Sequence, residues 1–321
     1  MFQENVLLSQ HSNYKIGGPA RYFVLAHSVE EITDSVALAK VKKLPILVLG
    51  GGTNILFSDA GFDGLVIKPY LKTIKRDGNL VRVGAGATVA ELLDFTVANK
   101  LSGLEWAGGL PGSVGGAIWG NAGAFGGETK DRLIDVTSLD ISGDMPVVHI
   151  RKNKEVSFGY RSSIFKEQQA APAGASLAQS TGREIILSAT FELKEGEPTD
   201  IQKIIDEKKQ YRTSRQPLEY PNIGSIFKNV DVKKVPKEVV EQFKHKIKLD
   251  PFPVLPTAVL NDAAGLKGLR VGGAMVSPKH PNFIVNVDNA TEKDVKAVIE
   301  LVMKEIHLRY GIELEREVIF W

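Results

Sequence analysis

Residues 103–128 read GLEWAGGLPGSVGGAIWGNAGAFGGE, in which ten glycines are interleaved with large apolar side chains. A flexible linker would carry few apolar residues, so this stretch is expected to be packed. Glycine has no Cβ and lets the backbone approach another group closely. The stretch therefore favours contact with something flat and large, such as a fused-ring cofactor. The alternative is a glycine-rich packing site between a helix and a strand.

A second glycine-rich loop, LGGGTNILFSD at residues 49–59, directly follows a strand-like run. Backbone N–H groups at such a strand end are free, and no Cβ keeps an anion away, so the loop suits a pyrophosphate. It has neither the Gly-Lys-Ser/Thr of a P-loop nor the G-x-G-x-x-G of a dinucleotide fold. A tight turn between strands explains this loop equally well when it is considered alone.

Four positions carry a hydroxyl residue three places before Glu, Gln or Asp, which is typical of a helix N-terminus. They are SVEE (28–31), TVAE (88–91), TDIQ (199–202) and TEKD (291–294). The last predicts a helix whose apolar residues recur at helical spacing and pack on a sheet. Lys296, Glu300 and Lys304 would lie on its solvent-exposed face. The apolar residues are Val295, Val298, Ile299, Val302 and Ile306.

Runs rich in Val, Ile and Leu between these caps predict strands. They lie at 22–26, 45–50, 64–68, 80–85, 184–193 and 282–287. The predicted strands and helices do not alternate regularly as β-α-β units, which indicates an α+β fold. The polar LKEGEPTD (193–200) predicts an interdomain linker. The Ala-, Gln- and Ser-rich segment at 166–182 predicts a flexible surface excursion without chemistry.

Composition narrows the class of protein. A chain of 321 residues suggests two or three domains, and a net charge of +2 argues against a nucleic-acid footprint. No run of apolar residues is long enough for a membrane span, and the N-terminus does not read as a signal peptide, so we expect a cytoplasmic protein. There is no cysteine, and the six histidines show no ligand spacing, so no metal site is predicted.

The segment PNIGSIFKN (221–229) contains Ser225-x-x-Lys228, a motif of serine acyl-transferring enzymes such as penicillin-binding proteins. Such an enzyme would also need Ser-Asp-Asn and Lys-Thr/Ser-Gly motifs, and neither occurs in the chain. A Gly-Ser pair is also a common turn. The segment alone leaves open whether Ser225 is a proton donor or a turn residue.

Seven motifs in a fixed order resemble the UDP-N-acetylenolpyruvoylglucosamine reductases, a family of peptidoglycan synthesis. They are YKIGGPARYFV (14–24), LGGGTNILFSDAGFDGLVI (49–67), GLPGSVGGAIWGNAGAFGGE (109–128), FGYRSSIFK (158–166), RQPLEYPNIGSIFKN (215–229), AGLKGLRVGGAMVSPKHPNFIVN (264–286) and LEREV (314–318). One branch of this family carries a tyrosine-bearing substrate loop. No tyrosine occurs here between Tyr160 and Tyr211, so the resemblance is to the branch without that loop.

The resemblance implies an α+β fold in two domains. Residues 1–195 would form an FAD-binding domain of the vanillyl-alcohol oxidase/PCMH type, with subdomains at about 1–69 and 70–195. Residues 196–321 would form a smaller α+β substrate-binding domain. A monomer acting on small molecules, without nucleic acid or membrane, is expected.

The resemblance also implies the activity. FAD would be reduced by NADPH and would pass the hydride to C3 of the enolpyruvyl ether of UDP-N-acetylglucosamine, giving UDP-N-acetylmuramate. Arg161 stands at the catalytic arginine, Glu317 at the catalytic glutamate, and Ser225 at the proton donor to C2. An arginine suits a carboxylate acceptor because its planar guanidinium binds carboxylates through two parallel hydrogen bonds.

Two further groups of residues follow from the resemblance. Lys228 and Asn229 would contact substrate. A non-covalent FAD would contact Gly50, Gly51, Gly52, Thr53, Asn54, Gly109, Ser113, Gly116, Ala117, Asn121 and Gly123. Phe125 stands where some relatives carry tyrosine. An FAD-dependent sugar or alcohol oxidase sharing the flavin domain remains the main alternative, and a non-catalytic flavin- or nucleotide-binding module is another.

Overall fold

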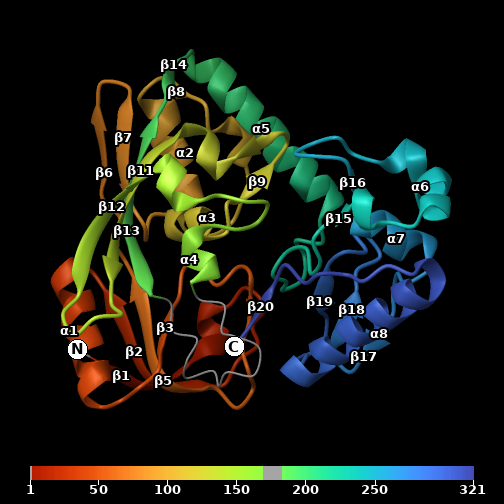
Figure 1. Cartoon of the computed structure of the whole chain (residues 1–321), viewed down its shortest axis with the longest axis horizontal. Helices are drawn as coiled ribbons and strands as arrows, with labels where there is room; N and C mark the ends of the chain where they lie inside the picture. Colours follow the sequence, from red (N-terminus) through yellow and green to blue (C-terminus); the bar gives the residue numbers. More distant parts are fainter. Residues whose placement is uncertain (1, 169–182) are drawn as a thin grey trace. The chain divides into compact units, whose positions relative to one another are not determined.

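The structure, a computed structural model, describes residues 2–168 and 183–321. Contacts divide the chain into two compact units that interleave along the sequence. The first comprises residues up to Val6, Ala20–Gly51 and Phe62–Arg212, and the second comprises Leu7–Pro19, Gly52–Gly61 and Thr213–Trp321. The chain therefore enters the second unit three times (Figure 1).

The first unit contains a four-stranded sheet in the order β1-β2-β5-β3. Its strands are β1 (Gln3–Leu7), β2 (Pro19–Ala26), β3 (Ile46–Val48) and β5 (Phe62–Pro69). β2 and β3 both run parallel to β5, and helix α1 (Val29–Val41) provides the crossover that parallel strands require. Ile32 and Val36 of α1 pack with Leu65 and Ile67 of β5 in one core.

A five-stranded antiparallel sheet of the same unit has the order β12-β11-β13-β7-β6. Its strands are β6 (Ile74–Asp77), β7 (Leu80–Gly84), β11 (Leu133–Asp140), β12 (Val147–Lys152) and β13 (Glu184–Glu192). Helices α2 (Val89–Ala98) and α3 (Val114–Trp119) share a core with this sheet.

Short elements and one long helix, α5, complete the first unit, and the last three residues of α5 fall in the second. They are β8 (Leu101–Ser102), η2 (Glu105–Ala107), β9 (Gly123–Ala124), β10 (Gly127–Glu128), η3 (Thr129–Arg132), η4 (Asn153–Val156), α4 (Ile164–Glu167), β14 (Lys194–Glu195) and α5 (Pro198–Arg215). β9 and β10 form a tight antiparallel hairpin around Phe125. This hairpin lies inside the glycine-rich stretch.

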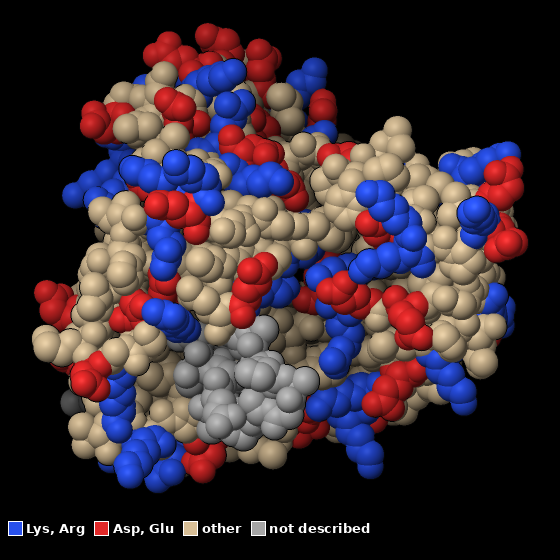
Figure 2. Space-filling model, viewed as in Figure 1, with Lys and Arg blue, Asp and Glu red and all other residues tan. Residues whose placement is uncertain are grey.

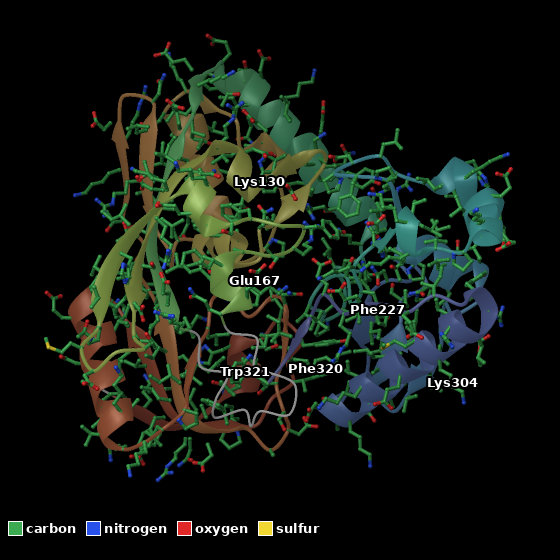
Figure 3. The ribbon with its side chains drawn as sticks, in the orientation of Figure 1. Lys130, Glu167, Phe227, Lys304, Phe320 and Trp321 are labelled. Atoms are coloured by element: carbon green, nitrogen blue, oxygen red, sulfur yellow. The ribbon has the colours of Figure 1, made fainter. Side chains whose placement is uncertain are left out.

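The second unit is built around β17 (Arg270–Val271), β18 (Ala274–Val276) and β19 (Ile284–Asn286), with α8 (Glu292–Tyr310) packed on this sheet. β4 (Ile55–Leu56) pairs in parallel with β20 (Ile319–Phe320). Figure 3 labels Phe320 and Trp321 at this strand. The remaining elements are η1 (Leu8–His11), β15 (Val230–Asp231), η6 (Val232–Lys234), α6 (Lys237–Phe243), η7 (Lys244–Lys246), β16 (Val254–Leu255) and α7 (Thr257–Ala263).

The α+β class predicted from the sequence is confirmed, and so are three of the four predicted caps. Ser28 accepts from the Glu31 N–H, and Thr88 and Thr291 form reciprocal capping boxes. All five predicted apolar residues of α8 are buried, and Glu300 and Lys304 (Figure 3) are exposed, whereas Lys296 is half-buried.

The fourth helix begins earlier than predicted, at Pro198, so Thr199 lies inside α5 rather than at its cap. Proline is favoured in the first helical turn because its missing N–H has no intrahelical partner there. The linker predicted at 193–200 is also ordered, since β14 pairs with β8 before α5 starts. The division into a 1–195 and a 196–321 binding domain stays a prediction. The excursion predicted at 166–182 falls, from residue 169 onward, outside the described residues.

Charges on the visible surface are mixed, with Lys and Arg interspersed among Asp and Glu (Figure 2). This agrees with the balanced composition, 40 Lys and Arg against 38 Asp and Glu. Among the described residues, no helix is both long and apolar enough to span a bilayer. In the same part of the chain, no group of three or more His, Asp or Glu side chains is arranged to hold a metal ion.

One buried ion pair joins two strands of the five-stranded sheet. Arg151 of β12 donates to Glu184 of β13 from Nε at 3.0 Å and from Nη2 at 2.5 Å, and the Glu184 side chain is fully buried. Ser138 and Gln168 also donate to this carboxylate. Burial alone would raise the pKa of Glu184, but these hydrogen bonds outweigh it and hold the pKa below its ordinary value of 4.5.

Replacing Arg151 with methionine should lower the free energy of unfolding by about 3–5 kcal/mol at pH 7, because it leaves a buried carboxylate without its cation. A lowered pKa contributes stability above pH 4.5 that is lost as the pH falls through the folded value, so the deficit should shrink in acid. Urea unfolding at several pH values measures both effects. Lys152→Met, which breaks the more exposed pair with Asp135, is the control and should cost about 1 kcal/mol or less. An equal loss for both variants would contradict this account.

Candidate functional site

The two glycine-rich loops predicted to bind a cofactor meet in the first unit. A Cβ built on Gly50 would lie 2.8 Å from Ser113 Oγ, and one built on Gly51 would lie 2.6 Å from the Cα of Gly112. Neither position has room for a side chain. The structure therefore joins the loop after β3 to the turn before α3, as one cofactor spanning both loops would require.

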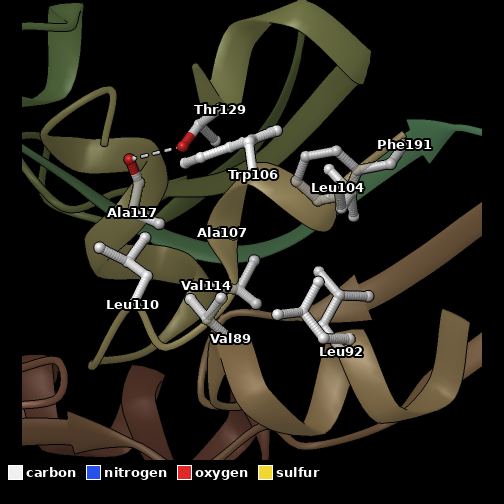
Figure 4. Close-up of a pocket in the computed structure, with 11 residues that line it drawn as sticks. Val89, Leu92, Leu104, Trp106, Ala107, Leu110, Val114, Ala117, Thr129 and Phe191 are labelled. Carbon is white, nitrogen blue, oxygen red and sulfur yellow. Dashed lines mark hydrogen bonds between the residues drawn. The ribbon is translucent and has the colours of Figure 1, made fainter. Parts of the chain in front are cut away.

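The apolar residues of the glycine-rich stretch face the interior of the unit. Leu104, Trp106, Leu110 and Val114 line a cavity of about 30 Å³ together with residues of α2 and Phe191 of β13 (Figure 4). The lining is almost entirely apolar, so the cavity is a packing feature of the core. The large apolar side chains that line this cavity are thus explained by the core, in agreement with the packing alternative, whereas Phe125 is exposed.

Several glycines of the stretch are explained by packing in the same way. A Cβ on Gly127 would come within 2.4 Å of the Trp106 ring, and one on Gly115 within 2.9 Å of the Ala85 methyl group. Gly116 is different, because it is exposed and an added Cβ would meet only Ser113 Oγ, at 3.4 Å. Among the described residues, no neighbour gives a packing reason for glycine at 116. A cofactor lying against this turn supplies one, so the residues present fit such a group.

Arg161 is held in a strained backbone conformation. Its φ is +55°, a left-handed value that is uncommon for a residue with a side chain. Nη2 donates to the carbonyl of Gly123 at 2.8 Å, and the guanidinium lies 5.3 Å from the Tyr160 ring centroid. Lys166 Nζ donates to the Arg161 carbonyl at 3.0 Å. These contacts fix the direction of the guanidinium, and such strain is typical of functional residues.

Asn121 braces the same region from inside. Its side chain is fully buried, Nδ2 donates to the Gly159 carbonyl at 2.9 Å, and Oδ1 accepts from the Lys130 N–H at 3.3 Å. The amide therefore ties the glycine-rich stretch to the turn that carries Arg161. The predicted contact between Asn121 and the flavin stays a prediction, and positioning this turn is the role that the structure shows.

Ser225 lies in an extended segment of the second unit, just after a turn. Gly224 has a φ of +83°, which only glycine adopts readily, and its N–H donates to Asn222 Oδ1 at 3.1 Å. Ser225 then forms an antiparallel bridge with Phe283, and the Ile226 N–H donates to the Asn282 carbonyl. Within the described residues, no protein group hydrogen-bonds the Ser225 hydroxyl. The backbone is fixed while the hydroxyl stays available.

Glu317 lies on the neighbouring segment. Its N–H donates to the Ile226 carbonyl at 2.8 Å, and the Lys228 N–H donates to the Glu315 carbonyl at 2.9 Å. Asn54 Nδ2 donates to the Glu317 carbonyl at 3.2 Å, which links the first glycine loop to this segment. The second unit therefore brings Ser225, Glu317 and Asn54 together through the backbone.

The two predicted substrate-binding residues both have protein partners. Lys228 pairs with Glu315, and its side chain is mostly buried, so it is not a solvated surface lysine. Asn229 Oδ1 accepts from the Thr257 N–H at 3.3 Å at the start of α7. Their predicted contacts with substrate stay predictions.

The predicted residues are divided between the units. Gly50, Gly51, the residues of the 109–123 stretch and Arg161 belong to the first, and Gly52, Thr53, Asn54, Ser225, Lys228, Asn229 and Glu317 belong to the second. Sequence reasoning missed Arg212, a buried arginine of α5. Its spacing of seven from Ile205 places it on the buried face of the helix and is the signal that was available.

Comparison with known proteins adds to this geometry. Residues 20–148 match the family model described as an FAD binding domain, so the chain contains a flavoprotein domain. Residues 216–321 match the model of the UDP-N-acetylenolpyruvoylglucosamine reductase C-terminal domain. The chain belongs to the family of UDP-N-acetylenolpyruvoylglucosamine reductases.

Whole-length similarities support the same family. The chain is 36% identical to the UDP-N-acetylenolpyruvoylglucosamine reductase of Lachnoclostridium phytofermentans over 98% of its own length and 91% of that protein. It is 36% identical to the one of Lactiplantibacillus plantarum, covering 98% and 92%. The crystal structure of the Thermus caldophilus reductase aligns over 100% of both chains at 31% identity with a TM-score of 0.73. The predicted family and the FAD-binding domain are thereby confirmed.

Proposed function

We propose that the protein reduces the enolpyruvyl ether of UDP-N-acetylglucosamine to UDP-N-acetylmuramate, a step of peptidoglycan synthesis, with FAD as cofactor and NADPH as reductant. Family membership supports the substrate. The observation that carries the chemistry is the Ser225 hydroxyl, which is available on a segment whose backbone is paired on both sides. The overall reaction adds one hydride and one proton across a carbon–carbon double bond.

Arg161 stabilises the negative charge of this reaction. The double bond is conjugated to a carboxylate, so hydride addition at C3 leaves a dianion spread over C2 and the carboxylate. A guanidinium fixed before the reaction stabilises developing charge without reorganising. The Gly123 carbonyl and the Tyr160 ring provide that fixation.

Ser225 supplies the proton to C2, and Glu317 assists. A serine hydroxyl is a weak acid, and it serves here because the carbanion that it protonates is strongly basic. The Glu317 N–H is anchored to Ile226, next to Ser225, so the carboxylate is on the adjacent strand segment. Glu317 polarises the site and relays the proton that restores the serine.

The cofactor residues that we propose are those of the two glycine loops. Gly50, Gly51, Gly52, Thr53 and Asn54 would hold the pyrophosphate, and Gly109, Ser113, Gly116, Ala117, Asn121 and Gly123 would contact the diphosphate and ring. When bound, FAD would supply the hydride transfer from NADPH to C3. The attachment is non-covalent, because the chain has no cysteine and neither glycine loop contains a histidine. Lys228 and Asn229 contact the substrate.

The test is to purify the protein, record its flavin spectrum, and follow NADPH oxidation with and without UDP-N-acetylglucosamine enolpyruvate. A yellow protein whose NADPH oxidation requires this substrate is expected, with UDP-N-acetylmuramate as the product. NADPH oxidation that proceeds equally without the substrate would overturn the proposal. Gel filtration and cell fractionation test the further proposal that the protein acts as a cytoplasmic monomer.

Gly116→Ala tests the cofactor site. Alanine is a better helix former, and its Cβ has room in the protein, so the thermal stability of the apoprotein should rise slightly. The methyl group would project where we place FAD, and FAD affinity should fall about tenfold, or about 1.4 kcal/mol. Flavin fluorescence titration measures it. Gly120→Ala is the control, since its Cβ is also accommodated, and FAD affinity should not change. Unchanged affinity in Gly116→Ala would remove this residue from the site.

A further inference from the structure

The position of the Ser225 hydroxyl depends on the backbone that carries it, because no group of the described residues hydrogen-bonds the hydroxyl itself. Ser225 forms an antiparallel bridge with Phe283, and the Ile226 N–H donates to the Asn282 carbonyl at 2.8 Å. On the other side of the segment, the Glu317 N–H donates to the Ile226 carbonyl at 2.8 Å. The residues that pair with this segment therefore determine where the hydroxyl lies.

The backbone pairing with residues 282 and 283 cannot continue past Ile226. In the same register, Phe227 lies opposite Pro281, and proline has no N–H to donate. The Pro281 carbonyl accepts from Asn261 Nδ2 at 2.8 Å instead. Phe227 (Figure 3) is 2% exposed, so water does not reach its backbone groups easily. A buried N–H and a buried C=O without partners would be costly.

The Asn282 side chain supplies both of the missing hydrogen bonds. Its Oδ1 accepts from the Phe227 N–H at 3.1 Å, and its Nδ2 donates to the Phe227 carbonyl at 2.9 Å. The amide therefore takes the place of the backbone groups that an opposing strand residue would offer. Asn282 is 4% exposed, and its own carbonyl already binds Ile226. One residue thus holds the two residues that follow Ser225.

The loop that presents Asn282 is itself fixed by hydrogen bonds. Ser277, which is 1% exposed, accepts through Oγ from the N–H groups of Lys279 at 3.2 Å and His280 at 3.3 Å. The Phe283 N–H donates to the His280 carbonyl, and the Ser277 N–H donates to the Phe283 carbonyl, both at 2.9 Å. A side chain on such a preorganised loop can position the group that it binds.

We propose that Asn282 is a positioning residue for the proton donor of the reaction. This inference rests on the proposed function, in which Ser225 protonates C2. A proton donor has to lie within hydrogen-bond reach of the atom that it protonates, and a misplacement of about 1 Å can lower a rate by about 100-fold. Asn282 acts on the reaction through the backbone that carries Ser225, so its loss should matter only where Ser225 matters.

The experiment compares Asn282→Leu with the wild-type holoenzyme by stopped-flow absorbance. Leucine has a similar volume and can form neither hydrogen bond. Reoxidation of the reduced flavin by UDP-N-acetylglucosamine enolpyruvate should slow by about 10- to 100-fold, because the donor is no longer held in place. Reduction of the flavin by NADPH requires no proton at C2 and should keep its wild-type rate.

Asn286→Leu is the matched control. Asn286 is 8% exposed, and its amide also binds two backbone groups, the Tyr14 carbonyl at 3.1 Å and the Ala290 N–H at 2.8 Å. Neither of these groups belongs to the segment that carries Ser225. The control should lower the melting temperature as Asn282→Leu does and should leave both half-reactions at their wild-type rates.

A double-mutant cycle distinguishes positioning from a general structural effect. In a Ser225→Ala background no donor remains to be positioned, so adding Asn282→Leu should slow reoxidation by less than about twofold. An equal loss in both backgrounds, or slower flavin reduction by NADPH, would make Asn282 purely structural and overturn the proposal. If Asn282→Leu does not fold, Asn282→Ala replaces it in the cycle, because water can enter the space and bind Phe227.

Two results separate this proposal from the proposed function. A wild-type protein that does not reduce the enolpyruvyl compound refutes the proposed function. A wild-type protein that turns over beside an Asn282→Leu variant with an unchanged reoxidation rate refutes only the inference about Asn282.

Discussion

Replacing Ser225 with alanine is expected to slow reoxidation of the reduced flavin by substrate by about 10²- to 10⁴-fold, the usual contribution of a positioned proton donor. Reduction of the flavin by NADPH needs no proton at C2, so that half-reaction should keep its wild-type rate. Stopped-flow absorbance near the flavin band measures both half-reactions in one preparation.

The structure explains why this variant should fold normally. The turn before Ser225 depends on Gly224 and Asn222, and the segment after it is held by backbone hydrogen bonds. None of these contacts uses the serine hydroxyl, and its removal leaves no group of residues 2–168 and 183–321 unsatisfied. The melting temperature should therefore stay within about 1 °C of the wild type, since a change well below 0.5 kcal/mol is expected.

Ser225→Thr serves as the control because it keeps a hydroxyl at the same position. It should retain much more of the substrate half-reaction than alanine does. If the alanine variant reoxidises with substrate as fast as the wild type, Ser225 is not the proton donor and the turn interpretation of PNIGSIFKN is sufficient. Loss of both half-reactions would indicate damage to the fold instead.

Arg161→Lys should lower the rate of substrate reduction by about 10²- to 10³-fold, the loss typical of one preorganised charge-stabilising group. Lysine keeps the charge, but it cannot bind a carboxylate with two parallel hydrogen bonds. It would also have to reproduce the contact with the Gly123 carbonyl from a single ammonium. Steady-state kinetics with saturating NADPH measure the effect.

A second substitution distinguishes the effect of the Arg161 guanidinium from the effect of the strained Arg161 backbone. Arg161→Gly relieves the left-handed conformation at φ +55° and should stabilise the folded protein by up to about 1 kcal/mol while abolishing substrate reduction. Arg183→Lys, at an exposed ion pair with Asp140, is the control for both variants and should change neither property. An Arg161→Lys enzyme that keeps its full rate would exclude this arginine from charge stabilisation.

Local features of the sequence were sufficient for much of the fold. α8 could be predicted from its capping box, formed by Thr291 and Asp294, and from the helical spacing of the apolar residues from Val295 to Ile306. Both signals depend only on residues that are neighbours in the sequence. The predicted start of α5 was wrong by two residues, because the helix begins at Pro198 and not after a Thr199 cap. Strands β11 and β12 were not predicted. β11 pairs with the distant strand β13 and, within the described residues, β12 pairs only with β11, so both depend on sheet pairing rather than on a distinctive local pattern.

The candidate site shows the same limit. The motifs indicated Arg161, Ser225 and Glu317, and the glycine loops indicated where a cofactor would lie. Short motifs do not reveal that Gly123 orients Arg161, that Asn121 braces its turn, or that Arg212 lies behind Phe125. The Arg161–Gly123 and Asn121–Gly159 contacts each join residues 38 positions apart, and Arg212 also binds the Gly108 carbonyl across 104 positions, so only the folded backbone brings these residues together.

The parallel pairing of β4 with β20 constrains the order in which the protein matures during translation. Asn54 and Glu317 are 263 positions apart, so residues 52–61 must wait for the last strand to leave the ribosome. The five-stranded sheet has no such delay, because all its strands are synthesised before residue 213. The boundary falls between Gly51 and Gly52, inside the proposed pyrophosphate loop. We therefore expect a nascent chain stalled after α5 to have its first sheets formed but no capacity to retain flavin.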